Sequence, residues 1–190
     1  MKSLTSATIA ILLLGHALGA QGAPAQARQG FGISFGLGGG SAGVSCDGCS
    51  SDRTGSLSGY LRLGGYVNPG LFVGGESSGW VHNENSVDET ISFLTAVVQW
   101  YPQPASGFYL KAGAGFSSAS ADDGFDEITA AGFGLTVGTG YDWRVTRNFS
   151  LTPYVNYLHT AGAELKANGA GTGFDANVSI LQFGLGFTWH

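Results

Sequence analysis

From residue 30 onward, apolar residues alternate with small or polar residues along most of the chain. Successive side chains of a β-strand point to opposite faces, so a period of two predicts strands with one apolar face and one small or polar face. The longest such alternation covers residues 131–143. The sequence predicts eight strands, at residues 31–38, 57–66, 70–81, 89–101, 108–116, 131–143, 149–157 and 181–190.

Two of these segments have an irregular pattern. In 70–81, Leu71 and Val73 lie on the face opposite Phe72, and 89–101 carries large apolar residues in both phases. A β-bulge would produce this pattern, and so would large residues packed inside a barrel. The sequence leaves both explanations open, and with them the facing of the third and fourth strands.

The connections between the predicted strands alternate in length. Short turns rich in Pro, Gly and Asn join three pairs of strands, whereas the longer polar connections cover 39–55, 82–89, 117–128 and 160–176. Short turns at one end and long loops at the other are typical of barrels that cross a membrane. An even number of strands also brings both ends of the chain to the short-turn end. We therefore expect an all-β fold, an eight-stranded antiparallel up-and-down transmembrane β-barrel.

The composition favours a barrel in lipid over a barrel in water. Charged residues make up 11% of the chain, against about 25% in soluble proteins. No apolar run long enough for a membrane helix follows the first 27 residues. A soluble barrel would place the apolar face inside and leave an outer surface of Gly, Ser and Thr that is poor in charge. The lipid-facing alternative instead predicts an aromatic girdle near the short-turn end, formed by Trp100, Phe108, Tyr141, Trp143, Phe149 and Trp189.

The first 27 residues have the features of an export signal. Lys2 gives a positive start, a short apolar run follows, and small residues allow cleavage after Gly19 or after Ala27. The apolar run is too short to span a membrane. The predicted organisation is therefore a signal peptide at 1–27 and a barrel at 28–190.

The last strand ends in Gln182, Gly184, Phe187 and Trp189, a pattern of polar-x-Gly-x-x-aromatic-x-aromatic. This pattern resembles the C-terminal assembly signal of outer-membrane β-barrel proteins, except that His190 follows the aromatic residue that usually ends the chain. With the leader, the eight strands and the unequal loops, the whole chain resembles the small outer-membrane β-barrel superfamily, of the OmpA type and without a periplasmic domain.

The resemblance implies a location and partners, but no single biochemical activity. It implies a monomeric barrel in the cell outer membrane of a Gram-negative bacterium. The barrel would contact outer-membrane lipid and would be inserted by the barrel assembly machinery. We expect no cofactor, no metal and no nucleic-acid partner, and the ligand of the loops stays open.

The charged residues separate by position. Eleven of the thirteen acids fall in the four long connections with only Arg53 and Lys166, a formal balance of −9 at that end. A charge facing lipid at the membrane midplane costs about 2–4 kcal/mol, so the charges within strands are expected inside the barrel as a paired network. Arg62 and Glu76 lie at similar distances from the turn between their strands, which makes them the best-matched pair. The predicted lumen network consists of Arg62, Glu76, Lys111 and Asp142.

Cys46 and Cys49 form a Cys-x-x-Cys pair in the first long connection. Such a pair serves in redox motifs and zinc sites. A redox motif needs an adjacent strand and helix, and a zinc site needs two further ligands. The sequence shows neither the strand and helix nor the additional ligands. In an exported loop, we expect a structural disulfide between Cys46 and Cys49.

Three functions are compatible with such a barrel. The first, which we favour, is a structural or surface-interaction role through the acidic extracellular loops. The second is a narrow, porin-like channel, because inward-facing glycines leave room in a barrel that side chains would otherwise fill. The third is a lipid-modifying enzyme, because the segment from His159 resembles the His-x-Ser motif of the lipid A deacylases. Ala161 occupies the serine position, and Thr160 is one residue away on the opposite face, so we expect no enzyme.

Overall fold

The computed structural model describes the backbone of residues 28–45, 53–84, 87–122, 127–167 and 170–190, and within these ranges all side chains except 122, 127, 164–167 and 170–176. The described residues form the strands β1 (Gly30–Ser45), β2 (Thr54–Asn68), β3 (Leu71–Glu84), β4 (Val87–Trp100), β5 (Phe108–Asp122), β6 (Glu127–Tyr141), β7 (Trp143–Thr146), β8 (Phe149–Ala167) and β9 (Ala170–Trp189). Within these ranges, no helix is long and apolar enough to cross a membrane.

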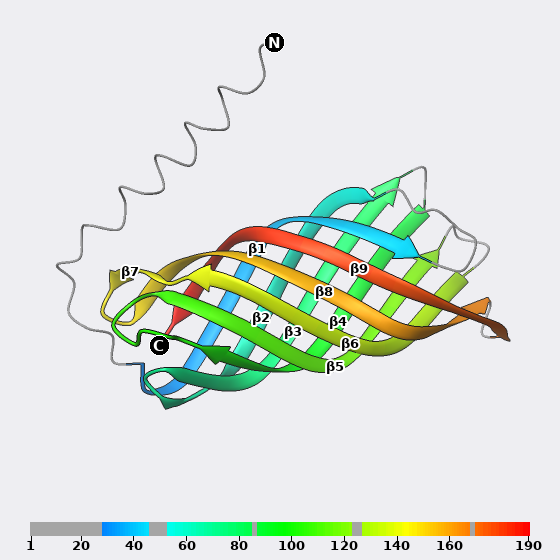
Figure 1. Cartoon of the computed structure of the whole chain (residues 1–190). Coiled ribbons are helices and arrows are strands. Elements are labelled where there is room, and N and C mark those ends of the chain that lie inside the picture. The colour runs from blue at the N-terminus through cyan, green and yellow to red at the C-terminus, as the bar shows by residue number, and fades with distance from the viewer. Residues whose placement is uncertain (1–27, 46–52, 85–86, 123–126, 168–169) are drawn as a thin grey trace, which may run out of the picture.

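The nine strands form one closed antiparallel barrel. Their order is β6-β5-β4-β3-β2-β1-β9-β8-β7, and a further pairing between β6 and β8 closes the sheet. β7 continues β6 after an interruption at Asp142, and both pair with β8. The two segments therefore count as one strand around the barrel, and the prediction of an eight-stranded up-and-down barrel is confirmed (Figure 1).

The first and last strands meet at the closing seam. The register runs from Ile33 opposite Trp189 to Ser45 opposite Asn177. On the outer face, the ring of Phe35 packs against Phe187 at 5.2 Å and against Trp189 at 5.9 Å between centroids. Backbone pairing and aromatic packing thus act together where the barrel shuts.

The strands are longer than the sequence pattern predicted. Residues 82–89 were expected to form a loop, but β3 and β4 remain paired out to Glu84 opposite Val87. β1 extends to Ser45 and β8 to Ala167 in the same way. The hydrogen-bond ladder requires only backbone groups, so it continues past the apolar part of each strand. Many of the acids therefore lie on strand ends, which together we call the acidic rim: Glu84, Asp88, Glu89, Asp122, Glu127, Glu164 and Asp175.

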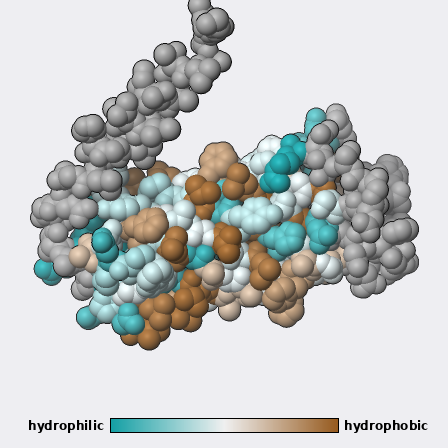
Figure 2. All heavy atoms as spheres, viewed as in Figure 1, coloured by the Kyte–Doolittle hydropathy of each residue, from teal (hydrophilic) through white to brown (hydrophobic). Residues whose placement is uncertain are grey.

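The outer face is apolar over most of the barrel. Large apolar residues from every long strand are exposed there, including Leu61, Val98 and Leu185, and Figure 2 shows apolar residues along the side of the molecule. Aromatic residues gather on this face near the short-turn end, including Trp100 at 53% exposure and Trp143 at 61%. Such a surface is stable in hydrocarbon and costly in water.

The irregular patterns of the third and fourth strands result from large residues inside the barrel. Phe72 and Trp80 on β3 and Phe93 on β4 are buried, with at most 4% exposure. The register between β3 and β4 is continuous from Leu71 opposite Trp100 onward, so no bulge changes the facing of either strand. Of the two explanations left open by the sequence, the packed interior is the one observed.

The interior has two parts along the barrel axis. The part nearer the short turns is polar and contains the charged residues of the strands. The part nearer the acidic rim contains a buried apolar cluster of Ala42, Trp80, Ile91, Phe93, Leu158, Val178 and Ile180. The polar part and the rim are therefore separated by an apolar layer.

Candidate functional site

The centre of the polar interior is a buried triad of Arg62, Glu76 and Lys111. Arg62 lies directly opposite Glu76 in the β2–β3 register, and its Nε donates to Glu76 Oε2 at 2.7 Å. Lys111 on β5, two strands away from β3, donates to Glu76 Oε1. The three side chains have at most 3% exposure. One carboxylate is thus shared by two cations, and Arg62 also donates to Gln99.

Asp142 belongs to a separate cluster. Its Oδ2 accepts from the Tyr101 hydroxyl at 2.7 Å and its Oδ1 from the Thr152 hydroxyl at 2.9 Å. Asp142 makes no ion pair with Lys111. The predicted four-residue lumen network therefore divides into the triad and this cluster, because Asp142 sits lower, at the break between β6 and β7. The amide of Gln99 links the two by donating to Tyr101.

Arg28, which the sequence analysis did not single out, completes the Asp142 cluster. Its guanidinium donates to the carbonyls of Pro104 and Ser106 at 2.8 and 2.9 Å. It also lies 3.8 Å from Asp142 and stacks 3.7 Å from the centroid of Tyr101. Arg28 is fully buried, so the residue just after the predicted leader is anchored at the short-turn end of the barrel. A basic residue at that position was the only signal for this role in the sequence.

His190, the last residue of the chain, lies at the same short-turn end of the barrel as Arg28. Its Nδ1 is 2.7 Å from the Tyr66 hydroxyl, its Nε2 is 3.2 Å from the Ser150 hydroxyl, and its backbone N–H donates to Asn148. His190 was expected only as the residue after the last aromatic, but its ring is held between Tyr66 and Ser150 at the short-turn end. Burial lowers the pKa of His190 from 6.5 to about 4, so the imidazole is neutral at pH 7.

The inward-facing glycines do not leave an open lumen. Side chains at Gly36 would collide with the ring of Tyr60 and lie 2.6 Å from that of Tyr154, and these two rings pack edge to face at 4.8 Å. The hydroxyl of Tyr109 fills the space at Gly140 in the same way. At these two positions, tyrosines from nearby strands fill the space that the glycines provide.

The residues of the predicted assembly signal have defined positions in the folded barrel. Gln182 points inward, accepts from Asn156 at 2.8 Å and donates to Ser58 at 2.7 Å, so it ties β9 to β8 and β2. Gly184 faces Gly38 across the seam, where an added Cβ would collide with the backbone at Leu37. Phe187 and Trp189 face outward and pack on the seam. All four thus have packing roles, whatever their part in assembly.

His159 and Thr160 lie on opposite faces of β8. His159 lies on the outer face and stacks on Tyr157, whereas Thr160 is buried on the inner face. Cys46 and Cys49 lie outside the described residues. In the part of the chain that is described, no group of three or more His, Cys, Asp or Glu side chains could hold a metal ion.

Comparison with known proteins identifies the barrel type. The sequence model of a family described as outer membrane protein beta-barrel domain matches residues 10–188. No curated protein sequence matches the chain significantly.

Three solved structures have similar folds. The attachment invasion locus protein Ail of Yersinia pestis matches with a TM-score of 0.60 at 15% identity, over 85% of this chain and 99% of Ail. Neisserial surface protein A matches with a TM-score of 0.59 at 20% identity, over 84% and 96% of the two chains. OprG from Pseudomonas aeruginosa matches with a TM-score of 0.52 at 15% identity, over 87% and 98%. At these identities the similarity concerns the fold.

Proposed function

We propose, because the chain belongs to the outer membrane protein β-barrel domain family, that the barrel is an anchor in the outer membrane and that its acidic rim is the working surface. The rim would bind a positively charged partner outside the cell. The observation that carries the proposal is the charge distribution: the seven acids of the acidic rim lie on strand ends at one end of the barrel, while the charged side chains inside the barrel are paired with one another.

The packing of the lumen argues for an anchor over a pore. The Arg62–Glu76–Lys111 triad crosses the polar interior, and Arg28 and His190 occupy its short-turn end. Between the triad and the acidic rim, the buried apolar cluster around Trp80 also occupies the lumen. An ion would have to displace both layers. We therefore expect no discrete conductance steps in planar bilayers, and regular steps would favour the channel instead.

The sign of the charge indicates the kind of partner. A structure of Ail contains sucrose octasulfate, a heparin analogue, which is a polyanion. The excess of carboxylates on the rim here would repel such a ligand and attract a cationic one. Attraction between exposed charges is screened by salt over about 8 Å at physiological ionic strength, so the proposed binding is salt-dependent.

The proposal includes export and assembly. Residues 1–27 direct the chain across the inner membrane as a signal peptide, and the barrel assembly machinery then inserts it as a monomer. The support is the short apolar run after Lys2 and the aromatic C-terminal strand.

Binding of a fluorescent lysine-rich peptide to the protein in phosphatidylcholine nanodiscs tests the rim. We expect binding that weakens as salt rises from about 0.05 to about 0.5 M, and that weakens in the double variant E84Q/D88N. Both side chains lie on the exposed β3–β4 end. R147Q, which changes one exposed charge at the opposite end, serves as the control and should bind normally. Equal binding of a glutamate-rich peptide, or no effect of E84Q/D88N, would contradict the proposal.

A further inference from the structure

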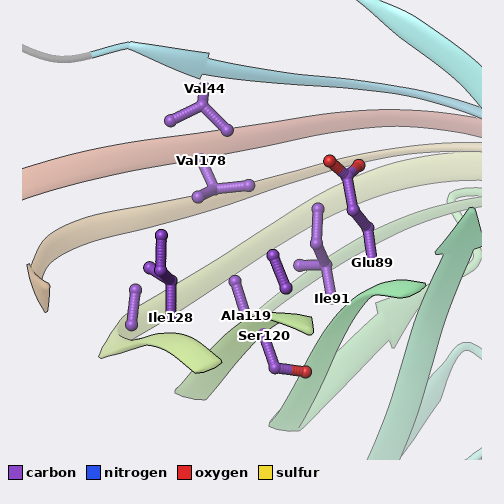
Figure 3. A pocket seen from close by; sticks show the side chains of 9 residues that line it. Val44, Glu89, Ile91, Ala119, Ser120, Ile128 and Val178 are labelled. Atoms are coloured by element: carbon purple, nitrogen blue, oxygen red, sulfur yellow. The ribbon is translucent and has the colours of Figure 1, made fainter. Parts of the chain in front are cut away.

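A cavity of about 200 Å³ opens at the acidic end of the lumen. Its wall comes from strands on both sides of the barrel and includes Val44 on β1, Ile91 on β4, Ala119 on β5, Ile128 on β6 and Val178 on β9. Figure 3 shows Ile91 on one side of this space and Val44 and Val178 on the other. We call this space the rim cavity.

The wall of the rim cavity is mainly apolar, although part of it is exposed. Val44 and Ile128 lie in the inward phase of their strands, yet they are 42% and 50% exposed. The buried cluster with Trp80 and Phe93 closes the cavity below. Exposed apolar side chains gain nothing from contact with water, and a concave apolar surface of this kind is typical of a ligand site.

One carboxylate lies in this apolar wall. Glu89 is half-buried and shares the inward phase of Ile91, and Figure 3 shows its carboxylate extending toward the side of the cavity that carries Val44 and Val178. Its cross-strand neighbour His82 pairs with Glu84 at 3.3 Å instead. Among the side chains that the structure describes, Glu89 has no ion-pair partner.

We propose that the rim cavity binds a small organic cation, with an apolar group in the cavity and an ammonium group on Glu89. A cavity of about 150 Å³ lined by apolar side chains is large enough for benzene, so the rim cavity accommodates one aromatic ring or a short alkyl chain. The acid excess at this end of the barrel raises the local concentration of cations. Glu89 is one acid of the rim, but the site can be tested apart from the proposed rim partner, because among the rim acids it requires only the inward-facing Glu89.

A matched pair of probes, 4-fluorobenzylamine and 4-fluorobenzyl alcohol, tests both parts of the site. Binding is followed by the fluorine NMR signal of each probe, with the protein in phosphatidylcholine nanodiscs and empty nanodiscs as the reference for partition into lipid. The amine should bind at least about 10-fold more tightly than the alcohol, the ratio expected for one charge-assisted hydrogen bond.

Three variants separate the charge from the cavity. E89Q should weaken binding of the amine about 10-fold and leave the alcohol unchanged. D88N removes the same charge one residue away, on the outward phase of β4, and should change binding by no more than about two-fold. A119L, which fills the cavity, should weaken both probes. Each variant is first checked for the wild-type difference in gel mobility between unboiled and boiled samples, so that loss of folding is not read as loss of binding.

The proposal fails if the amine does not bind, if the alcohol binds as tightly as the amine, or if E89Q and D88N have equal effects. It also fails if A119L binds the amine normally. None of these results decides whether the lysine-rich peptide binds the rim. That binding is tested with the double variant E84Q/D88N, in which Glu89 is unchanged.

Discussion

The substitution E76Q tests the electrostatic account of the barrel interior. It removes the charge of a fully buried carboxylate that accepts from both Arg62 and Lys111. The formal charge of the triad then rises from +1 to +2 with no counter-ion in contact. Removing one partner of a buried ion pair costs about 3–5 kcal/mol, because the remaining charge stays buried without compensation. We expect E76Q to lower the free energy of unfolding by about this amount.

K111M is the matched comparison. It removes one cation from the same triad and leaves the neutral pair of Arg62 and Glu76, joined at 2.7 Å. The large cost of breaking a buried ion pair comes from the uncompensated charge that stays buried, and K111M leaves no such charge. We therefore expect K111M to cost about 1 kcal/mol or less, although both variants change one charge.

Urea unfolding in phospholipid vesicles measures both variants. Tryptophan fluorescence follows the transition, and the mobility of unboiled samples on gels confirms that each variant starts as a folded barrel. An E76Q variant within about 1 kcal/mol of the wild type would refute the reasoning. So would a K111M variant that is destabilised as strongly as E76Q.

Three further predictions concern the short-turn end and the seam. R28A should lower the free energy of unfolding by about 1.5–3 kcal/mol, the worth of hydrogen bonds to a charged group. R28K should not restore it, because lysine lacks the planar guanidinium that donates to two carbonyls at once. Full recovery of stability by R28K in the same urea assay would contradict this role of Arg28. The imidazole of His190, assigned in NMR spectra by its loss in H190Q, should titrate near pH 4. Its contribution to stability should be complete above pH 6.5 and fall between pH 6.5 and about 4, where only the unfolded state binds the proton; a midpoint at 6.5 would show that the ring is not buried. W189A should reduce stability by about 1–3 kcal/mol through loss of two aromatic contacts, to Phe35 and Phe149; refolding yields and stability equal to wild type would show that the seam does not depend on these contacts.

The overall fold could be predicted because each face of a strand has a separate environment. Phe133, Leu135 and Val137 face outward while Gly134 and Thr136 face inward, and a period of two records this directly. The same alternation predicted that the charged side chains within the strands face the interior of the barrel. The alternating turn lengths indicated the up-and-down order, since the short turns can join only adjacent antiparallel strands.

Other features depend on contacts between residues distant in sequence. Trp80 and Phe93 share the lumen, so their inward facing could not be read from β3 or β4 alone. The space at Gly36 is taken by Tyr60 and Tyr154 from two other strands, which sequence alternation does not reveal.

Strand ends were missed for a different reason. Beyond the apolar segment the ladder is held by backbone hydrogen bonds, which leave no side-chain pattern, as at Glu84 opposite Val87. Arg28 was missed because its partners include the carbonyls of Pro104 and Ser106, and backbone acceptors have no signature in the sequence.

Electrophoresis of isolated outer membranes, with and without boiling, tests whether this chain is a membrane barrel. A closed sheet with an apolar exterior resists detergent until it is heated, so the account predicts that the protein is found in the outer-membrane fraction and migrates differently before and after boiling. Recovery in the soluble periplasmic fraction, with the same mobility under both conditions, would contradict it.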